Sequence, residues 1–316
     1  MGNLWRETAD PAAEPYRVLL ARDGLVDQVR DNRVVPIKIY YPVEHNLTRV
    51  PVIVWSHGLG GSVDGASFLA RFLAAQGYVI VHVQHKGTDS GLWEGKKGHP
   101  WDIIRATHIP REATLSRFGD VPFVLSKLPD WIRAHGGMDF ADVDNIGMSG
   151  HSFGALTTQV MMGQMFPDKD GRLRSYAEPR FKAGILYSPV PIAHMALDDP
   201  RDVYGSIDRP LFHMTGTEDA SPIEHFGYEH RLVVYEYSHG ERLLLTTQGG
   251  DHMIYNGSRG KLGASSNRER HETLIKIAAL AYWDWKLKGD EEAGNWLTGG
   301  GFASYLGDDG TLELER

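Results

Sequence analysis

The segment Gly150-His151-Ser152-Phe153-Gly154 sets a serine between two glycines in the pattern G-x-S-x-G. Residues 143–148 before it have the β-branched and apolar character of a buried strand, and residues 155–162 after it favour a helix. A serine at such a strand-to-helix turn is placed to act as a nucleophile. We therefore predict that Ser152 is nucleophilic; the alternative is a glycine-rich turn without catalytic meaning.

A serine hydroxyl needs an imidazole to take its proton and a carboxylate to orient that imidazole. Asp219 and His252 follow Ser152 in the order acid then histidine, and each comes just after a predicted strand. Because the carboxyl ends of parallel strands meet at one edge of a sheet, we expect the three side chains to converge there. Glu218 and Asp251 are neighbouring candidates for the acid, which we interpret as turn acceptors.

A tetrahedral oxyanion also needs two N–H donors. The segment His57-Gly58-Leu59-Gly60-Gly61 follows a predicted strand and resembles an oxyanion loop of the H-G-G-G type. We expect the backbone N–H of Leu59 to be one donor. The N–H of Phe153 is the expected second donor, because it stands at a helix N-terminus, where the helix dipole favours negative charge.

Other chemistries are poorly represented in the chain. It has no cysteine, which excludes thiol nucleophiles, disulfides and thiolate-bound zinc or iron–sulfur clusters. His82 and His85 have the spacing of a ligand pair but lack neighbouring partners. Asp168 begins a segment like a calcium loop, but Pro179 stands where the loop requires glutamate. We predict no metal site and no cofactor.

Short β-branched runs alternate with segments of helical period, which is typical of an α/β fold with a mostly parallel central sheet and helices on both faces. Apolar stripes predict helices around residues 68–73, 121–128 and 274–281, the second beginning with Asp120 as N-cap and Pro122 in its first turn. The predicted buried strands are 52–55, 78–81, 146–148, 184–187, 211–214 and 243–245.

The N-terminal part differs, because no helix separates its predicted strands 17–20 and 34–41. We expect an N-terminal antiparallel hairpin, joined through turns at Asp23-Gly24 and Asp31-Asn32.

No stretch reads as a linker, so residues 1–316 are expected to form a single domain with insertions at about 87–111 and 188–209. Long insertions in a compact domain are usually functional. We expect an apolar substrate pocket lined by aromatic residues from the first insertion and from the segments near the acid and the histidine: Trp93, Trp101, Phe226, Tyr228 and Tyr255.

The charge balance and hydropathy restrict the partners. Arg and Lys number 33 against 41 Asp and Glu, a net charge of −8 that argues against nucleic acid. No run approaches the roughly 18 apolar residues of a membrane span, and the first residues lack a signal-peptide core. The expected partner is a small-molecule or polymeric ester. The compartment (cytoplasmic, or exported with the signal removed), the oligomeric state and whether the insertion at 87–111 acts as a lid stay open.

These motifs together resemble the α/β-hydrolase superfamily, over about residues 34–287. The resemblance is closer to the bacterial predicted dienelactone-hydrolase-like group, related to platelet-activating-factor acetylhydrolase and to cutinase-like polyester hydrolases. The segments that carry it are 55–61, 150–155 and 249–253. It implies an α/β-hydrolase fold, Ser152 as nucleophile, and oxyanion donors at Leu59 and Phe153.

The position of the acid distinguishes two branches of this resemblance. In the acetylhydrolases the aspartate follows the strand after the nucleophile helix, where this chain has Ser188-Pro189. Asp219 instead resembles the cutinase-like arrangement, in which the acid ends a later strand. Dienelactone hydrolases use a cysteine nucleophile, which this chain does not contain.

We therefore expect a serine carboxylic ester hydrolase that forms an acyl-enzyme and acts on small to medium acyl esters. The alternatives are a polyester or phospholipid-type acyl hydrolase, then a peptidase or amidase on the same fold, then a hydrolase-fold binding protein without catalysis.

Overall fold

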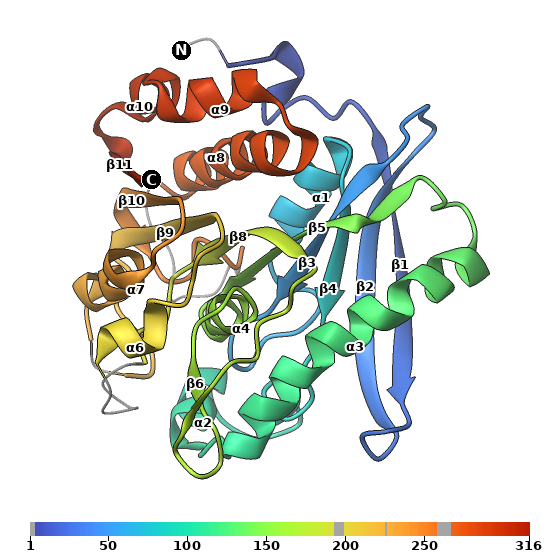
Figure 1. Cartoon of the computed structure of the whole chain (residues 1–316), viewed down its shortest axis with the longest axis vertical. Coiled ribbons are helices and arrows are strands. Elements are labelled where there is room, and N and C mark those ends of the chain that lie inside the picture. Colours follow the sequence, from blue (N-terminus) through green and yellow to red (C-terminus); the bar gives the residue numbers. More distant parts are fainter. Residues whose placement is uncertain (1–3, 193–198, 225, 258–266) are drawn as a thin grey trace.

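A nine-stranded sheet runs through the molecule in the order β1-β2-β4-β3-β5-β8-β9-β10-β11 (Figure 1). The computed structural model describes residues 4–192, 199–224, 226–257 and 267–316. The strands of the sheet are β1 (Arg17–Asp27), β2 (Arg33–Val43), β3 (Val50–Ser56), β4 (Val79–Val83), β5 (Ala141–His151), β8 (Phe181–Tyr187), β9 (Leu211–Glu218), β10 (Arg242–Asp251) and β11 (Gly310–Glu315). A separate two-stranded ribbon pairs β6 (Phe166–Pro167) with β7 (Leu173–Arg174).

The central strands β4, β3, β5, β8, β9 and β10 pair in parallel. The pairs β1–β2, β2–β4 and β10–β11 are antiparallel, so both edges of the sheet depart from the parallel pattern. The predicted fold class is confirmed: the sheet is mixed and mostly parallel, begins with an antiparallel hairpin, and is α/β-hydrolase-like.

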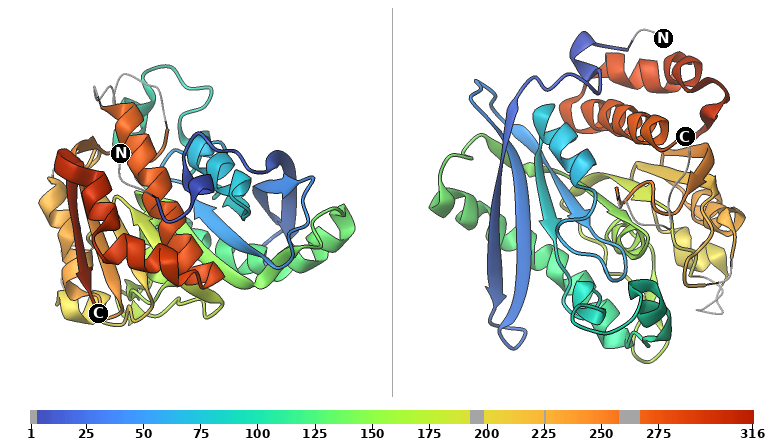
Figure 2. Two further views of the ribbon diagram at one scale, coloured as in Figure 1. Left: turned by 90° about the horizontal axis from the view of Figure 1, so that it is seen from above. Right: turned by 180° about the vertical axis from the view of Figure 1, so that it is seen from behind.

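Side chains alternate between the two faces of a sheet along each strand, so each face has side chains to bury. Helices cover both faces of this sheet. Helices α3 and α4 lie before the sheet in Figure 1, and α1 lies before it in the reverse view of Figure 2. The helices are α1 (Ser67–Ala75), α2 (Pro100–Ala106), α3 (Arg111–His135), α4 (Phe153–Met161), α6 (Pro200–Tyr204), α7 (Leu232–Tyr237), α8 (Arg268–Lys288), α9 (Glu291–Thr298) and α10 (Gly301–Leu306). Short 3-10 turns are η1 (Glu7–Ala9), η2 (Ser90–Leu92), η3 (Tyr228–Arg231) and η4 (Gly307–Asp309). No helix of the described segments is long and apolar enough to cross a membrane.

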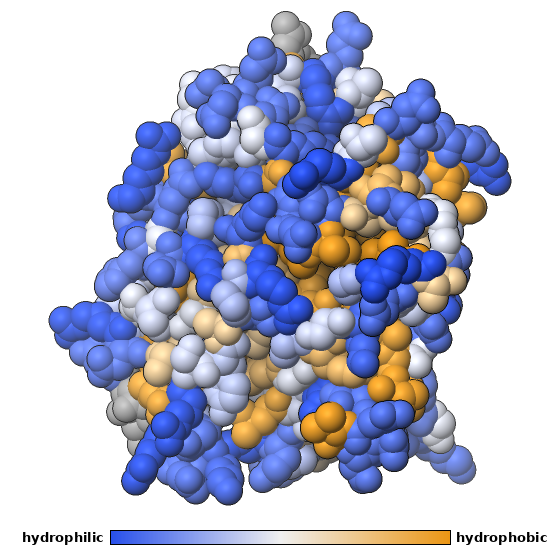
Figure 3. Space-filling view, turned by 45° about the vertical axis from the view of Figure 1, so that its right-hand side comes forward, coloured by the Kyte–Doolittle hydropathy of each residue, from blue (hydrophilic) through white to orange (hydrophobic). Residues whose placement is uncertain are grey.

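The surface drawn in Figure 3 is mainly hydrophilic, with hydrophobic side chains gathered toward its middle.

Strand β1 is an edge of the sheet, and charged residues such as Arg22 and Asp23 interrupt its exposed apolar residues, which limits pairing with another chain. The exposed large hydrophobic residues of the described chain lie in β1, β2 and the turn between them: Leu19, Leu20, Val26, Val29 and Val34.

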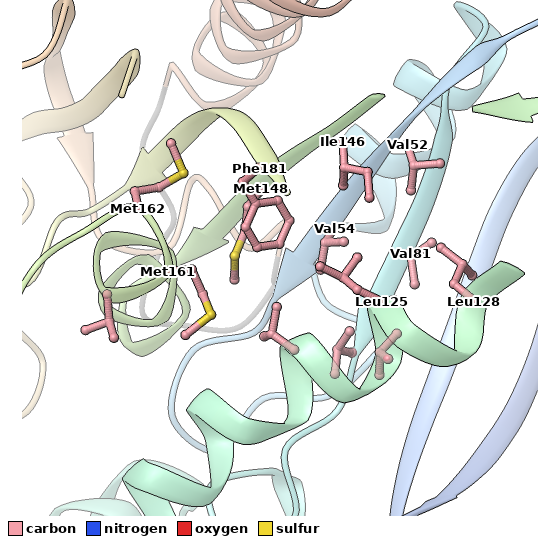
Figure 4. Packing of buried hydrophobic residues seen from close by; sticks show 14 of the residues in the cluster. Val52, Val54, Val81, Leu125, Leu128, Ile146, Met148, Met161, Met162 and Phe181 are labelled. Atoms are coloured by element: carbon pink, nitrogen blue, oxygen red, sulfur yellow. The ribbon is translucent and has the colours of Figure 1, made fainter. Parts of the chain in front are cut away.

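Each face of the sheet has its own buried core. Val52 and Val54 of β3 belong to the core under α3 and α4, while Ile53 and Trp55 belong to the core under α1 and α8. Figure 4 shows the first core, where Leu125 of α3 points toward the sheet. Burial on both faces explains why the central strands are continuous apolar runs.

One of the two predicted hairpin turns is wrong. Asp23 and Gly24 lie inside β1, where they pair with Ile37 and Pro36 of β2. A glycine and an aspartate are accepted there because β1 is an edge strand, and the Asp23 carboxylate accepts the Trp131 indole N–H at 2.7 Å. The chain reverses instead at Asp31-Asn32, where both residues have positive φ.

The predicted start of the second helix is also wrong. Helix α3 begins at Arg111, with Pro110 at its N-cap, so Asp120 and Pro122 both lie in its interior. Asp120 is fully buried and accepts hydrogen bonds from Arg33 and from the His85 ring, with Arg33 Nε at 2.7 Å. Its carboxylate therefore serves an ion pair between elements, which a local capping pattern does not reveal.

The insertion at 87–111 contains η2 and α2, and it ends where α3 begins. The insertion at 188–209 contains α6, and its residues 193–198 lie outside the described residues. Both insertions follow strands of the sheet, so they begin on the side of the carboxyl ends of the strands, where the candidate site is expected.

Candidate active site

Ser152 stands at the junction between β5 and α4. Its backbone has φ 55° and ψ −118°, a strained conformation for a residue other than glycine. The junction is held by its own N–H, which donates to the Tyr187 carbonyl at 2.9 Å, and by its carbonyl, which accepts from Leu156 at 3.0 Å. This turn presents the side chain at the carboxyl end of the sheet, and Ser152 is partly exposed there.

The two glycines of the motif are explained by close packing. A Cβ on Gly154 would overlap the Ser56 carbonyl oxygen, and a Cβ on Gly150 would overlap the Gly154 carbonyl. Only glycine lets α4 start this close to β3. The flanking glycines therefore determine where Ser152 lies relative to the oxyanion loop.

Asp219 and His252 are brought together although 33 positions separate them in the chain. Nδ1 of His252 lies 2.7 Å from Oδ1 of Asp219, while Thr215 donates its hydroxyl to Oδ2 at 2.9 Å. Asp219 follows β9, His252 follows β10, and both are buried. With its proton on Nδ1 directed at Asp219, the imidazole keeps Nε2 as a proton acceptor.

Sequence reasoning missed a buried cation beside this pair. Arg231, at the end of η3, lies with Nε 3.1 Å from Oδ1 of Asp219 and donates from Nε to the Asp219 carbonyl at 2.8 Å. It also donates to the Pro189 carbonyl at 2.9 Å, and its Nη2 lies 3.1 Å from Nδ1 of His252. No short-range pattern marks this residue, because its partners come from three separate segments.

Burial and charge act in opposite directions on the acid. Burial disfavours the carboxylate of Asp219, but Arg231 and His252 outweigh that effect, so its pKa is lowered. Burial also lowers the pKa of His252, and Arg231 adds to the lowering while Asp219 opposes it. The pair is therefore an ionised carboxylate beside a neutral imidazole.

His151, the residue before Ser152, was not expected to contribute. Its Nε2 lies 2.7 Å from the His252 carbonyl, so it donates a hydrogen bond to the backbone of the candidate base. The two rings lie 4.6 Å apart, and burial holds the pKa of His151 well below its usual range. A neutral His151 thus links the serine turn to the segment that carries His252.

The expected oxyanion donors lie on the two elements that flank Ser152. In the described chain, neither the Leu59 nor the Phe153 N–H donates to another protein group, as an oxyanion site requires. Gly60 has φ +71°, and its N–H donates to the Thr88 carbonyl at 2.9 Å, which fixes the loop. The loop that carries Leu59 is thus held by a backbone hydrogen bond.

A second buried arginine contacts both the loop that carries Leu59 and the helix that begins with Phe153. Arg117 of α3 donates to the His57 carbonyl and to the Ser56 hydroxyl at 2.9 Å. Its Nε donates to the Thr157 hydroxyl at 2.6 Å, and its guanidinium lies 4.6 Å from the Phe153 ring centre. Burial lowers the pKa of Arg117 to about 9. It ties the loop after β3 to the first turns of α4.

Residues 22–93 match the model of the family described as platelet-activating factor acetylhydrolase, isoform II. The matched segment begins within β1, covers β2, β3 and β4 with the loop of residues 57–61, and ends at Trp93, before Ser152. A search of curated proteins finds no match. The chain is therefore similar to this family over its N-terminal part, including one of the two expected oxyanion donors.

Two cavities meet at Ser152. The histidine-side cavity, about 270 Å³, is lined by His252, Met253, Trp93 and Trp101 together with the oxyanion loop. The helix-side cavity, about 580 Å³, is lined by Phe153 and Leu156 of α4 and by Phe166, Val190 and Ile192. Both cavities share Leu59, Ile104, Ser152 and Ile223.

The aromatic residues expected in a pocket are not all brought together. Trp93 and Trp101 line the histidine-side cavity, and the Trp93 indole N–H donates to the Gly60 carbonyl at 2.7 Å. Tyr255 is fully buried, 5.6 Å from the Tyr187 ring. Phe226 lies 5.1 Å from the Arg231 guanidinium, and Tyr228 begins η3. These last three aromatics are outside the described walls of both cavities.

His82 and His85 lie at the end of β4 but have separate partners. His82 contacts the Val63 carbonyl at 2.9 Å, and His85 lies between the Ser56 hydroxyl and Asp120. Among the described residues, no three histidine, aspartate or glutamate side chains form a group that could hold a metal ion.

Proposed function

We propose that this protein is a serine ester hydrolase that works through an acyl-enzyme. The observation that carries the proposal is the strained turn of Ser152, which lines one cavity together with His252. Nδ1 of this buried histidine lies 2.7 Å from Oδ1 of Asp219. The match of residues 22–93 to an acetylhydrolase family supports an ester as substrate.

In the first half of the proposed reaction, Oγ of Ser152 attacks the ester carbonyl carbon while Nε2 of His252 takes its proton. The oxyanion receives hydrogen bonds from the N–H groups of Leu59 and Phe153. Asp219 holds the imidazole and stabilises the imidazolium. The intermediate then breaks its bond to the alcohol oxygen, which leaves with the proton from His252.

In the second half, His252 takes a proton from water as the water oxygen attacks the acyl carbon of the Ser152 ester. Collapse of this intermediate breaks the bond to Oγ, and His252 returns the proton to Ser152. The products are a carboxylic acid and the free enzyme, so the scheme consumes one water and uses no cofactor.

A second candidate is an acyl hydrolase of phospholipids, which the name of the matched family favours. Here the Ser152 chemistry is the same and the alcohol is a glycerophospholipid. Release of acetate from a 2-acetyl phosphocholine lipid, compared with release from p-nitrophenyl acetate, distinguishes the two. A higher kcat/KM on the lipid than on p-nitrophenyl acetate would favour an acyl hydrolase of phospholipids.

The nucleophile is tested by Ser152→Ala, assayed on p-nitrophenyl esters and with a fluorophosphonate probe. We expect kcat to fall by roughly 10⁵- to 10⁶-fold and labelling to disappear, because the covalent step is lost. Ser126→Ala is the matched control, since Ser126 is exposed on α3, where its hydroxyl bonds to the Pro122 carbonyl and to Arg180, away from the candidate site. Labelling that survives in the Ser152 variant would refute the proposal.

A further inference from the structure

The two cavities at Ser152 differ in which catalytic group they contain. His252 lines the histidine-side cavity, whereas Phe153, whose N–H is a proposed oxyanion donor, lines the helix-side cavity. Ile104 from α2 and Ile223 from the segment after β9 lie in the walls of both. The two spaces therefore extend from the reacting serine in different directions.

The position of the base assigns a direction to each half of an ester. The alcohol oxygen must lie near Nε2 of His252, because it leaves with the proton that His252 holds. The alcohol group accordingly extends into the histidine-side cavity. The acyl group is bound to the same carbonyl carbon but points away from the base, which directs it past Phe153 into the helix-side cavity.

The walls of the helix-side cavity suit an apolar group. Leu156 and Ile192 are buried, and Phe166 and Val190 are partly buried beside them. Three of its charged lining residues, Arg105, Arg111 and Glu224, are exposed. The fourth, Arg231, is buried, and its guanidinium is held by Asp219 and by the Pro189 carbonyl. The volume of about 580 Å³ exceeds the 270 Å³ on the other side of Ser152.

We infer that the preferred substrates are esters of an extended apolar acyl group with a more compact alcohol. The acyl group occupies the helix-side cavity and the alcohol group the histidine-side cavity. This inference rests on the proposed ester hydrolase function and adds to it a substrate class.

The test uses two series of esters. In the acyl series p-nitrophenol is constant and the acyl group runs from acetate to decanoate; in the alcohol series acetate is constant and the alcohol runs from methanol to octanol. We expect the wild-type kcat/KM to keep rising up to longer chains in the acyl series than in the alcohol series. Val190→Phe should lower the octanoate-to-acetate ratio of kcat/KM roughly tenfold, since it fills space used by the longer chain.

Two further variants make this result specific. Met253→Trp narrows the histidine-side cavity and should lower the octyl-to-methyl ratio in the alcohol series. Val29→Phe makes the same chemical change as Val190→Phe at a side chain that is 94% exposed, and both ratios should stay at wild-type values. If Val190→Phe does not fold, Val190→Ala should raise the ratio of decanoate to octanoate.

The outcomes separate the inference from the function on which it rests. Turnover that depends on Ser152, with ratios unaltered by the Val190 and Met253 variants, overturns the inference alone. A change in the alcohol series from Val190→Phe would mean that the cavities are used in the opposite sense, which also overturns it. Loss of Ser152 dependence on every ester overturns the proposed function itself.

Discussion

At the proposed site, the carboxylate of Asp219 orients the imidazole of His252. Asp219 accepts from His252 and Thr215 and lies beside Arg231. In Asp219→Asn the amide cannot favour the same imidazole tautomer, so we expect kcat to fall by roughly 10⁴-fold. Steady-state kinetics on p-nitrophenyl butyrate would measure this.

The neighbouring acids provide the control for that substitution. The Asp251 carboxylate accepts the Met253 backbone N–H at 2.7 Å, and Glu218 is exposed at the end of β9. Asp251→Asn and Glu218→Gln should each keep kcat within an order of magnitude of wild type. An active Asp219→Asn beside an inactive Asp251→Asn would move the acid to Asp251.

Arg231 is a positioning residue whose charge also affects titration of the base. It lowers the pKa of His252, in addition to the larger effect of burial. Since a catalytic base must be neutral, kcat/KM rises with pH through the pKa of His252. Arg231→Met removes the cation, so the acidic limb of the kcat/KM profile should shift to higher pH.

The conservative variant separates charge from packing. Arg231→Lys keeps a cation near Asp219 but loses the hydrogen bonds that the guanidinium makes to the Pro189 carbonyl. Its acidic limb should stay closer to wild type than that of Arg231→Met, while kcat falls in both. Identical pH profiles for wild type and Arg231→Met would contradict the electrostatic role.

At the scale of elements, the approach of α4 to β3 is the determining contact. Gly154→Ala sets a Cβ against the Ser56 carbonyl, which belongs to the backbone of β3 and cannot rotate away. We expect the free energy of unfolding to fall by roughly 3 kcal/mol, together with a loss of esterase activity, because α4 must shift away from Leu59. Urea unfolding measures the first effect.

Gly24→Ala is the matched control for this substitution. Gly24 lies on the edge strand β1, and an added Cβ there would contact only the side chain of Val34 at 3.1 Å. Activity should be unchanged and the free energy of unfolding should change by less than in Gly154→Ala. Equal losses in the two variants would show that close packing at Gly154 is not special.

At the scale of the whole molecule, Asp284 of α8 joins distant parts of the chain. Its buried carboxylate accepts from Arg6 near the N-terminus at 2.8 Å and from the Tyr78 hydroxyl at 2.8 Å, and Lys288 lies 3.1 Å away. Asp284→Ala removes the buried carboxylate that these groups share, so we expect a loss of roughly 3 kcal/mol in the free energy of unfolding.

An exposed ion pair gives the comparison for Asp284. Asp130 pairs with Arg133 on the surface of α3, and its side chain is 72% exposed. Asp130→Ala should cost roughly 0 to 1 kcal/mol, because water screens such pairs. Thermal unfolding of both variants, with p-nitrophenyl esterase activity beside it, would test the contrast. A loss for Asp284→Ala as small as that for Asp130→Ala would contradict the stabilising role of the buried Asp284 contacts.

Much of the architecture is determined by local patterns in the sequence. Apolar runs such as 52–55 and 211–214 predict buried strands because both faces of a parallel sheet are covered, and they lie in β3 and β9. The glycines around Ser152 and the order of Asp219 and His252 are likewise visible in the chain. Each of these signals is carried by neighbours in sequence or by the order of strands.

Only the tertiary structure decided the partners of buried charges. Asp120 has the sequence context of a helix cap, yet Arg33 and His85 draw it into the interior of α3. Asp219 and His252 follow β9 and β10, which are neighbours in the sheet, so Arg231 of η3 can contact both of them. A buried charge is costly unless it is paired with an opposite charge, and the partner that the fold supplies has no fixed spacing along the chain.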